Sequence, residues 1–233
     1  LYSSAASDVY KRQGEYTFAG THIQCVDLPG TYSLESSDDQ VSLDEKIARD
    51  YVATREADLI INIIDASNIE RNLYLTSQLI EMRVPMILVL NMMDAVKRRG
   101  IKISIDAMAT QLGCPVIAIS AATKQGIPAL KTAINQSAVH QVIPTITIPY
   151  IAQLENAIAQ LQPQLSVVAQ TYPCDARWLT LRLLENDTLA QRIAGSEMCV
   201  FVTQFQQQIE AETDDEIDIL AADGRYEFVC LLY

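Results

Sequence analysis

Short apolar segments that alternate with amphipathic segments constrain this chain more than any other feature of its sequence. Leu59–Ile64 and Pro85–Leu90 are brief apolar runs, typical of strands that are covered on both faces. Between and around them, Ser42–Thr54 and Asn68–Met82 carry apolar residues at helical spacing. Strands that alternate with helices through short loops predict an α/β domain with a mostly parallel sheet.

The same alternation continues on both sides of this region. A strand at Val116–Ile119 is expected between helices at Asp106–Leu112 and Ile127–Gln136. Near the start, Glu15–Ala19 and His22–Leu28 alternate polar and apolar residues around a tight turn, which predicts a β-hairpin.

The pattern changes at Val142–Pro149, where two prolines and β-branched residues favour an extended connector. Beyond it the signal is helical, so we expect a small all-α domain. We therefore divide the chain into an α/β domain at 14–141, a linker at 142–150 and a helical domain at 151–230. Helices are expected at Ile151–Gln170, Asp175–Glu185, Leu189–Ile193, Cys199–Ala211 and from Asp215 onward.

Composition excludes several classes of protein. Seventeen basic and 29 acidic residues give a net charge of −12, which disfavours nucleic acid as a partner. No apolar run approaches the roughly 18 to 20 residues of a membrane span. The five cysteines are scattered without a Cys-x-x-Cys pair, which argues against a disulfide framework and a zinc site.

The sequence patterns at the two ends of the chain do not predict that they belong to either domain. Leu1–Gln13 lacks strand and helix periodicity and lacks the apolar core of a signal peptide. We expect a leader over residues 1–13 that is either non-native, resembling translated cloning sequence, or a disordered tail. Leu231–Tyr233 could share that origin.

Three short motifs are expected in loops just past three successive parallel strands, at the edge where open α/β sheets bind ligands. The first is Asp27-Leu28-Pro29-Gly30. Asp27 can hold a magnesium ion through water, and Gly30 lets the backbone N–H approach a terminal phosphate. An Asp that caps a turn closed by Gly explains the same residues without any ligand.

The second motif is Asn91-Met92-Met93-Asp94. A fixed carboxylate at Asp94 can accept two parallel hydrogen bonds, from N1–H and the 2-amino group of guanine, and adenine offers neither donor. Asn91 can tie neighbouring loops together. Asx capping of a loop turn is the alternative for this motif.

The third motif is Ser120-Ala121-Ala122. Small residues there let a backbone N–H reach the guanine O6, while the Ser120 hydroxyl braces Asp94. Each motif is weak alone. Their order, each one after a buried strand, is the layout of a small GTPase-type domain without its first motif.

Longer stretches resemble one family, the bacterial ferrous iron transport protein B, FeoB. The similarity is carried by Val26–Leu34, Asp65–Leu75, Asn91–Asp94, Leu112–Ser120, Trp178–Glu185 and Ala222–Phe228. The resemblance implies a P-loop-NTPase-like G domain, here with its first strand and P-loop missing. It also implies that the helical domain acts like a GDP-dissociation inhibitor.

The resemblance further implies ligands and partners. GTP or GDP and Mg²⁺ would be the cofactors, with Asp27 serving the metal, Leu28 and Pro29 lining the loop, and Gly30 near the γ-phosphate. Asn91, Met92, Met93 and Asp94 would bind guanine, and Ser120, Ala121 and Ala122 would complete the base pocket. Gly30 through about Asp39 would be the second switch, a loop whose position depends on the γ-phosphate. We assign no catalytic residue.

The parent protein would lie at the cytoplasmic face of the bacterial inner membrane, where GTP hydrolysis gates uptake of ferrous iron through a membrane domain. Iron would be cargo that this segment does not bind. A homo-oligomer is left open. The alternatives are a soluble GTPase of ribosome-assembly type and an interaction fragment that binds no nucleotide.

Three departures from the usual GTPase pattern lead to further expectations. Thr31 stands where many GTPases place a water-orienting Gln, so hydrolysis should be slow. Met92 replaces the common Lys, which predicts looser guanine binding. The G-x-x-x-x-G-K-[ST] loop is not found in the sequence, so this fragment should bind GTP poorly and turn it over negligibly. A gap or exposed apolar edges should separate the strand that ends at Asp27 from Leu59–Ile64.

Overall fold

The computed structural model describes residues 12–31, 33–34 and 43–232. Most of the expected leader lies outside these residues. Arg12 and Gln13 are the exception, because both belong to the first strand, where we had expected no strand periodicity. Leu232, which we had set aside with the C-terminal end, packs into the core and is 8% exposed.

The chain begins with the predicted hairpin. Strand β1 (Arg12–Phe18) pairs antiparallel with β2 (Thr21–Asp27). Ala19 and Gly20 form the turn with φ of 49° and 85°, the left-handed conformation that matches the twist of a two-residue hairpin. The Thr21 hydroxyl donates to Asn135 Oδ1 at 2.6 Å, and this contact holds the hairpin against helix α6 (Ile127–Val139).

A parallel sheet of three strands forms the centre of the α/β part. Its order is β3 (Ile60–Asp65), β4 (Met86–Asn91) and β5 (Val116–Ala118). The side chains of Met86–Leu90 are fully buried, as expected for an apolar strand covered on both faces. The prediction of a mostly parallel sheet is confirmed for these three strands.

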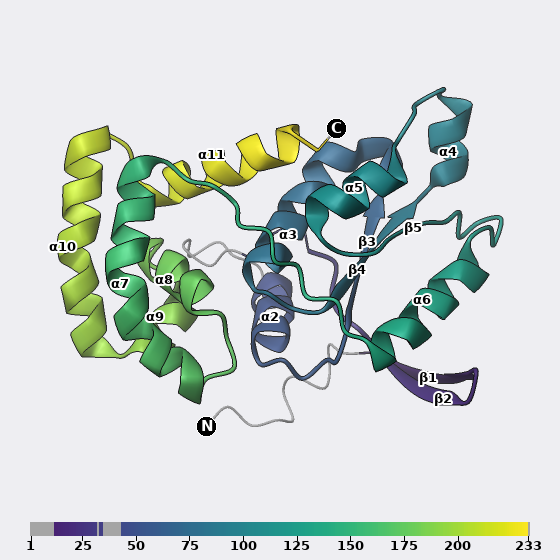
Figure 1. Cartoon of the computed structure of the whole chain (residues 1–233), viewed down its shortest axis with the longest axis horizontal. Helices are drawn as coiled ribbons and strands as arrows, with labels where there is room; N and C mark the ends of the chain where they lie inside the picture. The colour runs from purple at the N-terminus through teal and green to yellow at the C-terminus, as the bar shows by residue number, and fades with distance from the viewer. Residues whose placement is uncertain (1–11, 32, 35–42, 233) are drawn as a thin grey trace.

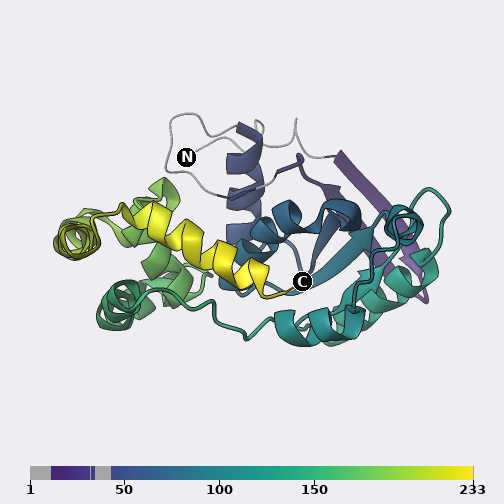
Figure 2. The ribbon, with the colours of Figure 1, turned by 90° about the horizontal axis from the view of Figure 1, so that it is seen from above.

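Helices cover both faces of this sheet (Figures 1 and 2). Leu88 and Leu90 share one core with α3 (Ile69–Glu81) and α5 (Ile105–Leu112), whereas Ile87 and Val89 pack against α6. Two further helices are α2 (Leu43–Ala53) and the short α4 (Met93–Arg98), and a 3-10 turn, η1, spans Ala66–Asn68. We did not predict α4.

The hairpin and the parallel sheet are separate among the described residues. Strand β2 forms ladder hydrogen bonds with β1 alone, and β3 forms one edge of the three-stranded sheet. Ile63 on β3 is 58% exposed. The expected gap and exposed apolar edge are therefore confirmed. The strand that carries Asp27 is not a member of the parallel sheet, which corrects our placement of all three motifs on successive parallel strands.

The second half of the chain is helical, as predicted. Residues 141–151 form a connector without helix or strand. It leads to α7 (Ala152–Thr171), α8 (Ala176–Leu184), α9 (Thr188–Ala194), α10 (Ser196–Thr213) and α11 (Ile217–Cys230).

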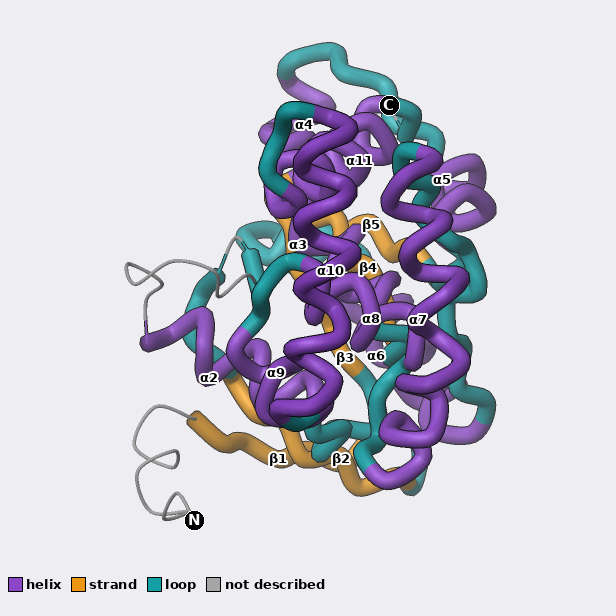
Figure 3. Tube along the Cα trace, turned by 90° about the vertical axis from the view of Figure 1, so that its left-hand side faces the viewer, coloured by secondary structure: helices purple, strands orange, loops and turns teal. Residues whose placement is uncertain are grey.

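Figure 3 shows α7 and α10 side by side, and α11 runs back from this bundle toward α3 (Figure 1). One continuous apolar core includes residues of both halves. None of the helices in the described ranges has the length and hydropathy to span a bilayer.

Candidate functional site

The second motif lies at the carboxyl end of β4. Asn91 is the last residue of that strand, and Met93 and Asp94 form the first turn of α4, where we had expected a loop. Met92 joins the two elements with φ of 64°. This left-handed residue turns the chain sharply, so that Asn91 and Asp94 both remain at the strand end.

Asn91 ties two loops together. Its Oδ1 accepts hydrogen bonds from the backbone N–H of Met92 at 2.8 Å and from the backbone N–H of Ala121 at 3.1 Å. The second bond crosses from β4 to the segment after β5. The predicted role of Asn91 in joining neighbouring loops is therefore seen in the structure.

Asp94 is held by two side chains. The Ser120 hydroxyl donates to Oδ1 at 2.8 Å, and Arg98 Nη1 donates to Oδ2 at 2.7 Å. The hydrogen bond from Ser120, followed by the one from Arg98, lowers the pKa of the Asp94 carboxyl. The carboxylate is therefore ionised at neutral pH and retains lone pairs on both oxygens. These properties fit the two donors on the guanine edge.

The loop after β5 takes its shape from one glycine. Ser120 pairs with Gln125 in an isolated bridge, and Gly126 follows with φ of 80°. A Cβ at Gly126 would lie 2.2 Å from the carbonyl oxygen of Ala118. Glycine is therefore required where α6 returns to the sheet, and this close approach places Ser120 and Ala121 beside the second motif. Ala121 and Ala122 are exposed.

The first motif lies apart from this group. Asp27 ends β2 with an exposed side chain, while Leu28 packs against the core. Within the part of the chain that the structure describes, no hydrogen bond or ion pair joins Asp27 to Asn91 or Asp94. Pro29 is half-buried and Gly30 is exposed, and a Cβ on Gly30 would meet nothing within 4 Å.

The exposed carboxylate of Asp27 has the chemistry of a magnesium ligand. Mg²⁺ keeps several waters and needs only one or two protein carboxylates when phosphates share its coordination. The described residues contain no group of three or more His, Cys, Asp or Glu side chains that could hold a metal by themselves. One exposed carboxylate fits an ion held jointly with a nucleotide.

The loop after Gly30 is connected to α3. Gln78 on α3 accepts a hydrogen bond from the Leu34 backbone N–H at 2.7 Å and donates one to the Ser33 hydroxyl at 3.1 Å. Leu34 is buried. Of the second switch expected from Gly30 to about Asp39, Tyr32 and residues 35–39 lie outside the described residues.

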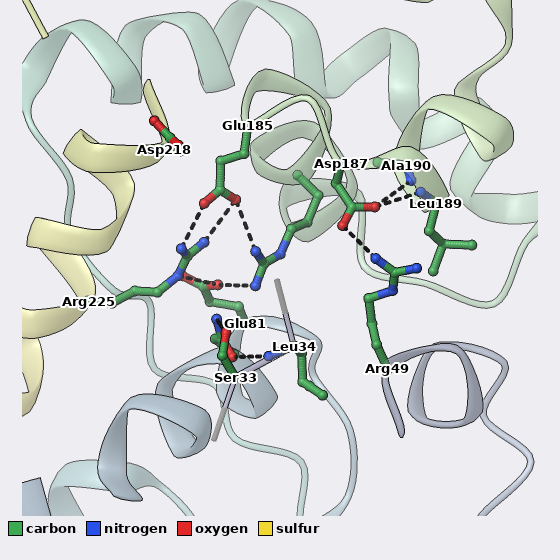
Figure 4. A network of polar contacts seen from close by, with 12 residues as sticks. Ser33, Leu34, Arg49, Glu81, Glu185, Asp187, Leu189, Ala190, Asp218 and Arg225 are labelled. Atoms are coloured by element: carbon green, nitrogen blue, oxygen red, sulfur yellow. Dashed lines mark hydrogen bonds and ion pairs between the residues drawn. The ribbon is translucent and has the colours of Figure 1, made fainter. Parts of the chain in front are cut away.

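Helix α3 is in turn connected to the helical domain through buried charges (Figure 4). Glu81, its last residue, accepts from Arg225 Nε at 3.1 Å. Arg225 donates both terminal nitrogens to Glu185, at 2.7 and 2.9 Å, and Arg182 adds a contact to Glu185 at 3.3 Å. Tyr150 donates a further hydrogen bond to Glu81.

The neighbouring arginines favour the ionised form of Glu185 in this cluster. Burial alone would raise the pKa of Glu185, but the neighbouring Arg225 and Arg182 outweigh it and lower the pKa. Burial, reinforced by the charge of Glu81, raises the pKa of Tyr150, so the phenol stays protonated and can donate.

A second buried pair joins α2 to the start of α9. Arg49 Nη1 donates to Asp187 Oδ2 at 3.1 Å, and Asp187 Oδ1 caps α9 by accepting from the backbone N–H groups of Leu189 and Ala190. Sequence reasoning missed both charge clusters. The available signal was the presence of Arg182, Glu185 and Arg225 within otherwise apolar helix faces.

Two family models match the chain. One, described as "Ferrous iron transport protein B", matches residues 5–134, and the other, "FeoB cytosolic helical domain", matches residues 150–230. The Fe(2+) transporter FeoB of Salmonella typhimurium is 36% identical over 229 residues, and that of Escherichia coli strain K12 is 37% identical over 233 residues. Each alignment covers 98% of this chain and 29% of the relative. The chain thus spans less than a third of the length of the curated relatives.

Solved structures agree with these matches. The cytosolic domain of L. pneumophila FeoB superposes with a TM-score of 0.79 at 36% identity, over 95% of this chain and 83% of that one. The cytosolic domain of T. maritima FeoB in its GMPPNP form gives 0.78 at 29% identity, over 95% and 82%. An S. thermophilus NFeoB double mutant bound to GDP·AlF4⁻ gives 0.80 at 30% identity, over 97% and 86%.

Proposed function

This chain belongs to the FeoB family of ferrous iron transport proteins, and on that premise we propose that it is the guanine-nucleotide-binding cytosolic part of a bacterial Fe²⁺ transporter. The G domain of this family is a GTPase. Nucleotide binding and hydrolysis there would gate iron passage through a membrane domain carried by the rest of the protein. Iron is the cargo, and we assign no iron ligand in this segment.

The observation that carries the proposal is the hydrogen-bonded group at the ends of β4 and β5. Asn91 bonds to Ala121, and Ser120 bonds to Asp94. An ionised carboxylate with a fixed orientation and free lone pairs complements the N1–H and 2-amino donors of guanine. Nucleotide-bound relatives, with GMPPNP in one and GDP·AlF4⁻ in another, support the same ligand here.

The phosphate side of the proposal rests on Asp27, Leu28, Pro29 and Gly30. Asp27 would hold Mg²⁺ through water, and the exposed backbone at Gly30 would donate to the γ-phosphate. Because the 233 residues contain no P-loop motif, we infer that this chain alone binds GTP weakly and hydrolyses it negligibly. Thr31 is too short to orient an attacking water.

The two halves of the chain have different proposed roles, nucleotide binding in the first and regulation in the second. We place the G domain at 14–141, the linker at 142–150 and the helical domain at 151–230. The buried contacts of Arg225 with Glu81 and of Asp187 with Arg49 support a regulatory role for the helical domain toward the loop after Gly30. The match to the FeoB cytosolic helical domain disfavours the ribosome-assembly alternative.

A base-exchange titration tests the proposal. The chain is titrated with GDP, ADP and XDP while NMR follows the amides of residues 91–94 and 120–122. GDP is expected to shift them at millimolar concentration and ADP is not. Asp94→Asn should reverse the preference toward XDP, because an amide can donate to the 2-oxo group of xanthine. No response to any of the three nucleotides would favour the interaction fragment that binds no nucleotide, and equal shifts with GDP and ADP would refute guanine recognition by Asp94.

A further inference from the structure

The carboxylate of Asp94 is held from two different elements, one at each oxygen. Ser120, after β5, donates to Oδ1, and Arg98, one helical turn beyond Asp94 in α4, donates to Oδ2 at 2.7 Å. The serine contact was expected from the sequence. The arginine contact was not, and the proposed function gives it no task.

Both contacts affect how the carboxylate can turn. The terminal torsion of an aspartate side chain is broad and roughly two-fold. A single hydrogen bond therefore holds one oxygen but still allows the carboxylate to rotate, which moves the other oxygen. Two contacts, one on each oxygen, fix that plane. Each carboxylate oxygen has about two lone pairs, so each retains one for a ligand.

Recognition of guanine requires a carboxylate plane with a fixed orientation. The N1–H and the 2-amino group lie side by side on one edge of the base, and two parallel hydrogen bonds form only if both oxygens face that edge together. We propose that Arg98 is a positioning residue for guanine recognition, holding Oδ2 of Asp94 in register with the base edge without touching the base. This inference rests on the proposed function.

The small contribution of the Arg98–Asp94 ion pair to folding stability distinguishes this positioning role from a structural one. The Arg98 side chain is 69% exposed and that of Asp94 is 24% exposed. An exposed pair at this helical spacing contributes little to folding, because water and salt screen it. Loss of Arg98 should therefore leave unfolding unchanged and appear in base selectivity instead.

The test compares GDP with IDP, which lacks the 2-amino group, on the full 233-residue chain. Arg98→Met should weaken GDP binding about twofold, the scale of a helical surface ion pair, and should weaken IDP binding less. Arg98→Lys keeps a cation within reach and should restore most of the GDP preference. Lys97→Met removes the same charge one residue away while leaving the Arg98–Asp94 pair in place, and it should behave as wild type.

Salt provides a second readout. In about 1 M salt, where screening acts over about 3 Å, the difference between wild type and Arg98→Met should shrink. An unchanged ratio of GDP to IDP affinity in Arg98→Met would overturn the positioning role while leaving the guanine site intact. An equal loss in Lys97→Met would also overturn it. A wild-type chain that does not prefer GDP to ADP would refute the proposed function itself, and this inference with it.

Discussion

Single residues with unusual backbone conformations shape the two loops that carry Asn91, Asp94 and Ser120. Met92 at φ of 64° turns the chain from β4 into α4, and Gly126 at φ of 80° turns it from β5 toward α6. The two differ in what surrounds them. A side chain is tolerated at Met92, where it is 40% exposed, whereas backbone fills the space at Gly126.

Gly126→Ala should destabilise the chain by about 2–4 kcal/mol, because it adds left-handed strain to a clash with the Ala118 carbonyl. Urea unfolding measures the loss. Gly20→Ala is the matched control, since Gly20 has φ of 85° but open space around it, and it should cost about 1 kcal/mol. Equal losses in the two variants would show that the close approach at Gly126 has no energetic weight.

Ser120→Ala should raise the pKa of Asp94, because the Ser120 hydrogen bond is the largest cause of its low value. The depressed pKa keeps the carboxylate ionised, and guanine binding possible, as the pH falls. In the variant, binding should be lost at a higher pH than in wild type. Carboxyl NMR titration reads the pKa directly. Thr123→Ala, which removes a hydroxyl from the same loop, should leave it unchanged.

At the scale of elements, periodicity predicted nearly every helix and strand to within a few residues. Helix α4 was missed because its six residues are too few to show a period. The pairing of the hairpin with α6 was missed as well, since Thr21 and Asn135 are 114 positions apart. Periodicity finds the buried face of an element, but it does not identify the element that covers that face.

The candidate site shows the same limit. The sequence brought Asn91, Asp94, Ser120 and Ala121 together because strand ends share one edge of a parallel sheet. It did not indicate that Arg98 holds Asp94, or that Glu81 meets Arg225 across 144 positions. Ion pairs between distant helices leave no local pattern in a single sequence.

Arg225→Met should destabilise the chain by about 3–5 kcal/mol at neutral pH, because it leaves Glu81 and Glu185 buried without their main partner. The folded-state pKa of Glu185 is lowered in wild type. Its contribution to stability is thus present above the unfolded pKa of about 4.3 and is lost as the pH falls through the lower, folded value. The difference in free energy of unfolding between the variant and wild type should therefore become smaller over that acidic range.

Chemical denaturation at several pH values measures the difference in free energy of unfolding between Arg225→Met and wild type. Arg177→Met is the control, since Arg177 pairs with the more exposed Glu155, and its loss should stay near 1 kcal/mol or below. If the loss of unfolding free energy in Arg225→Met does not depend on pH, packing of the arginine stem, and not its charge, accounts for the effect.

At the scale of the whole molecule, the two halves share one core and two buried charge clusters. We therefore expect a single cooperative unfolding transition. Fluorescence of Trp178, the lone tryptophan, reports the helical half, and amide exchange in β4 reports the sheet. The two should lose structure at the same urea concentration. Protection in β4 that outlasts the Trp178 signal would show that the halves unfold independently.

The open flank of β3 has a consequence for how copies of this chain behave in solution. Among residues 12–31, 33–34 and 43–232, no strand pairs with the outer edge of β3, and Ile63 on this strand is exposed. Such an edge offers backbone donors and acceptors to any extended segment that meets it, including the same edge of another molecule. Sedimentation should show association that grows with protein concentration, and Ile63→Lys should suppress it. Crowding many copies together would thus favour intermolecular β-pairing, and a peptide strand able to cap the flank would act as a solubilising agent.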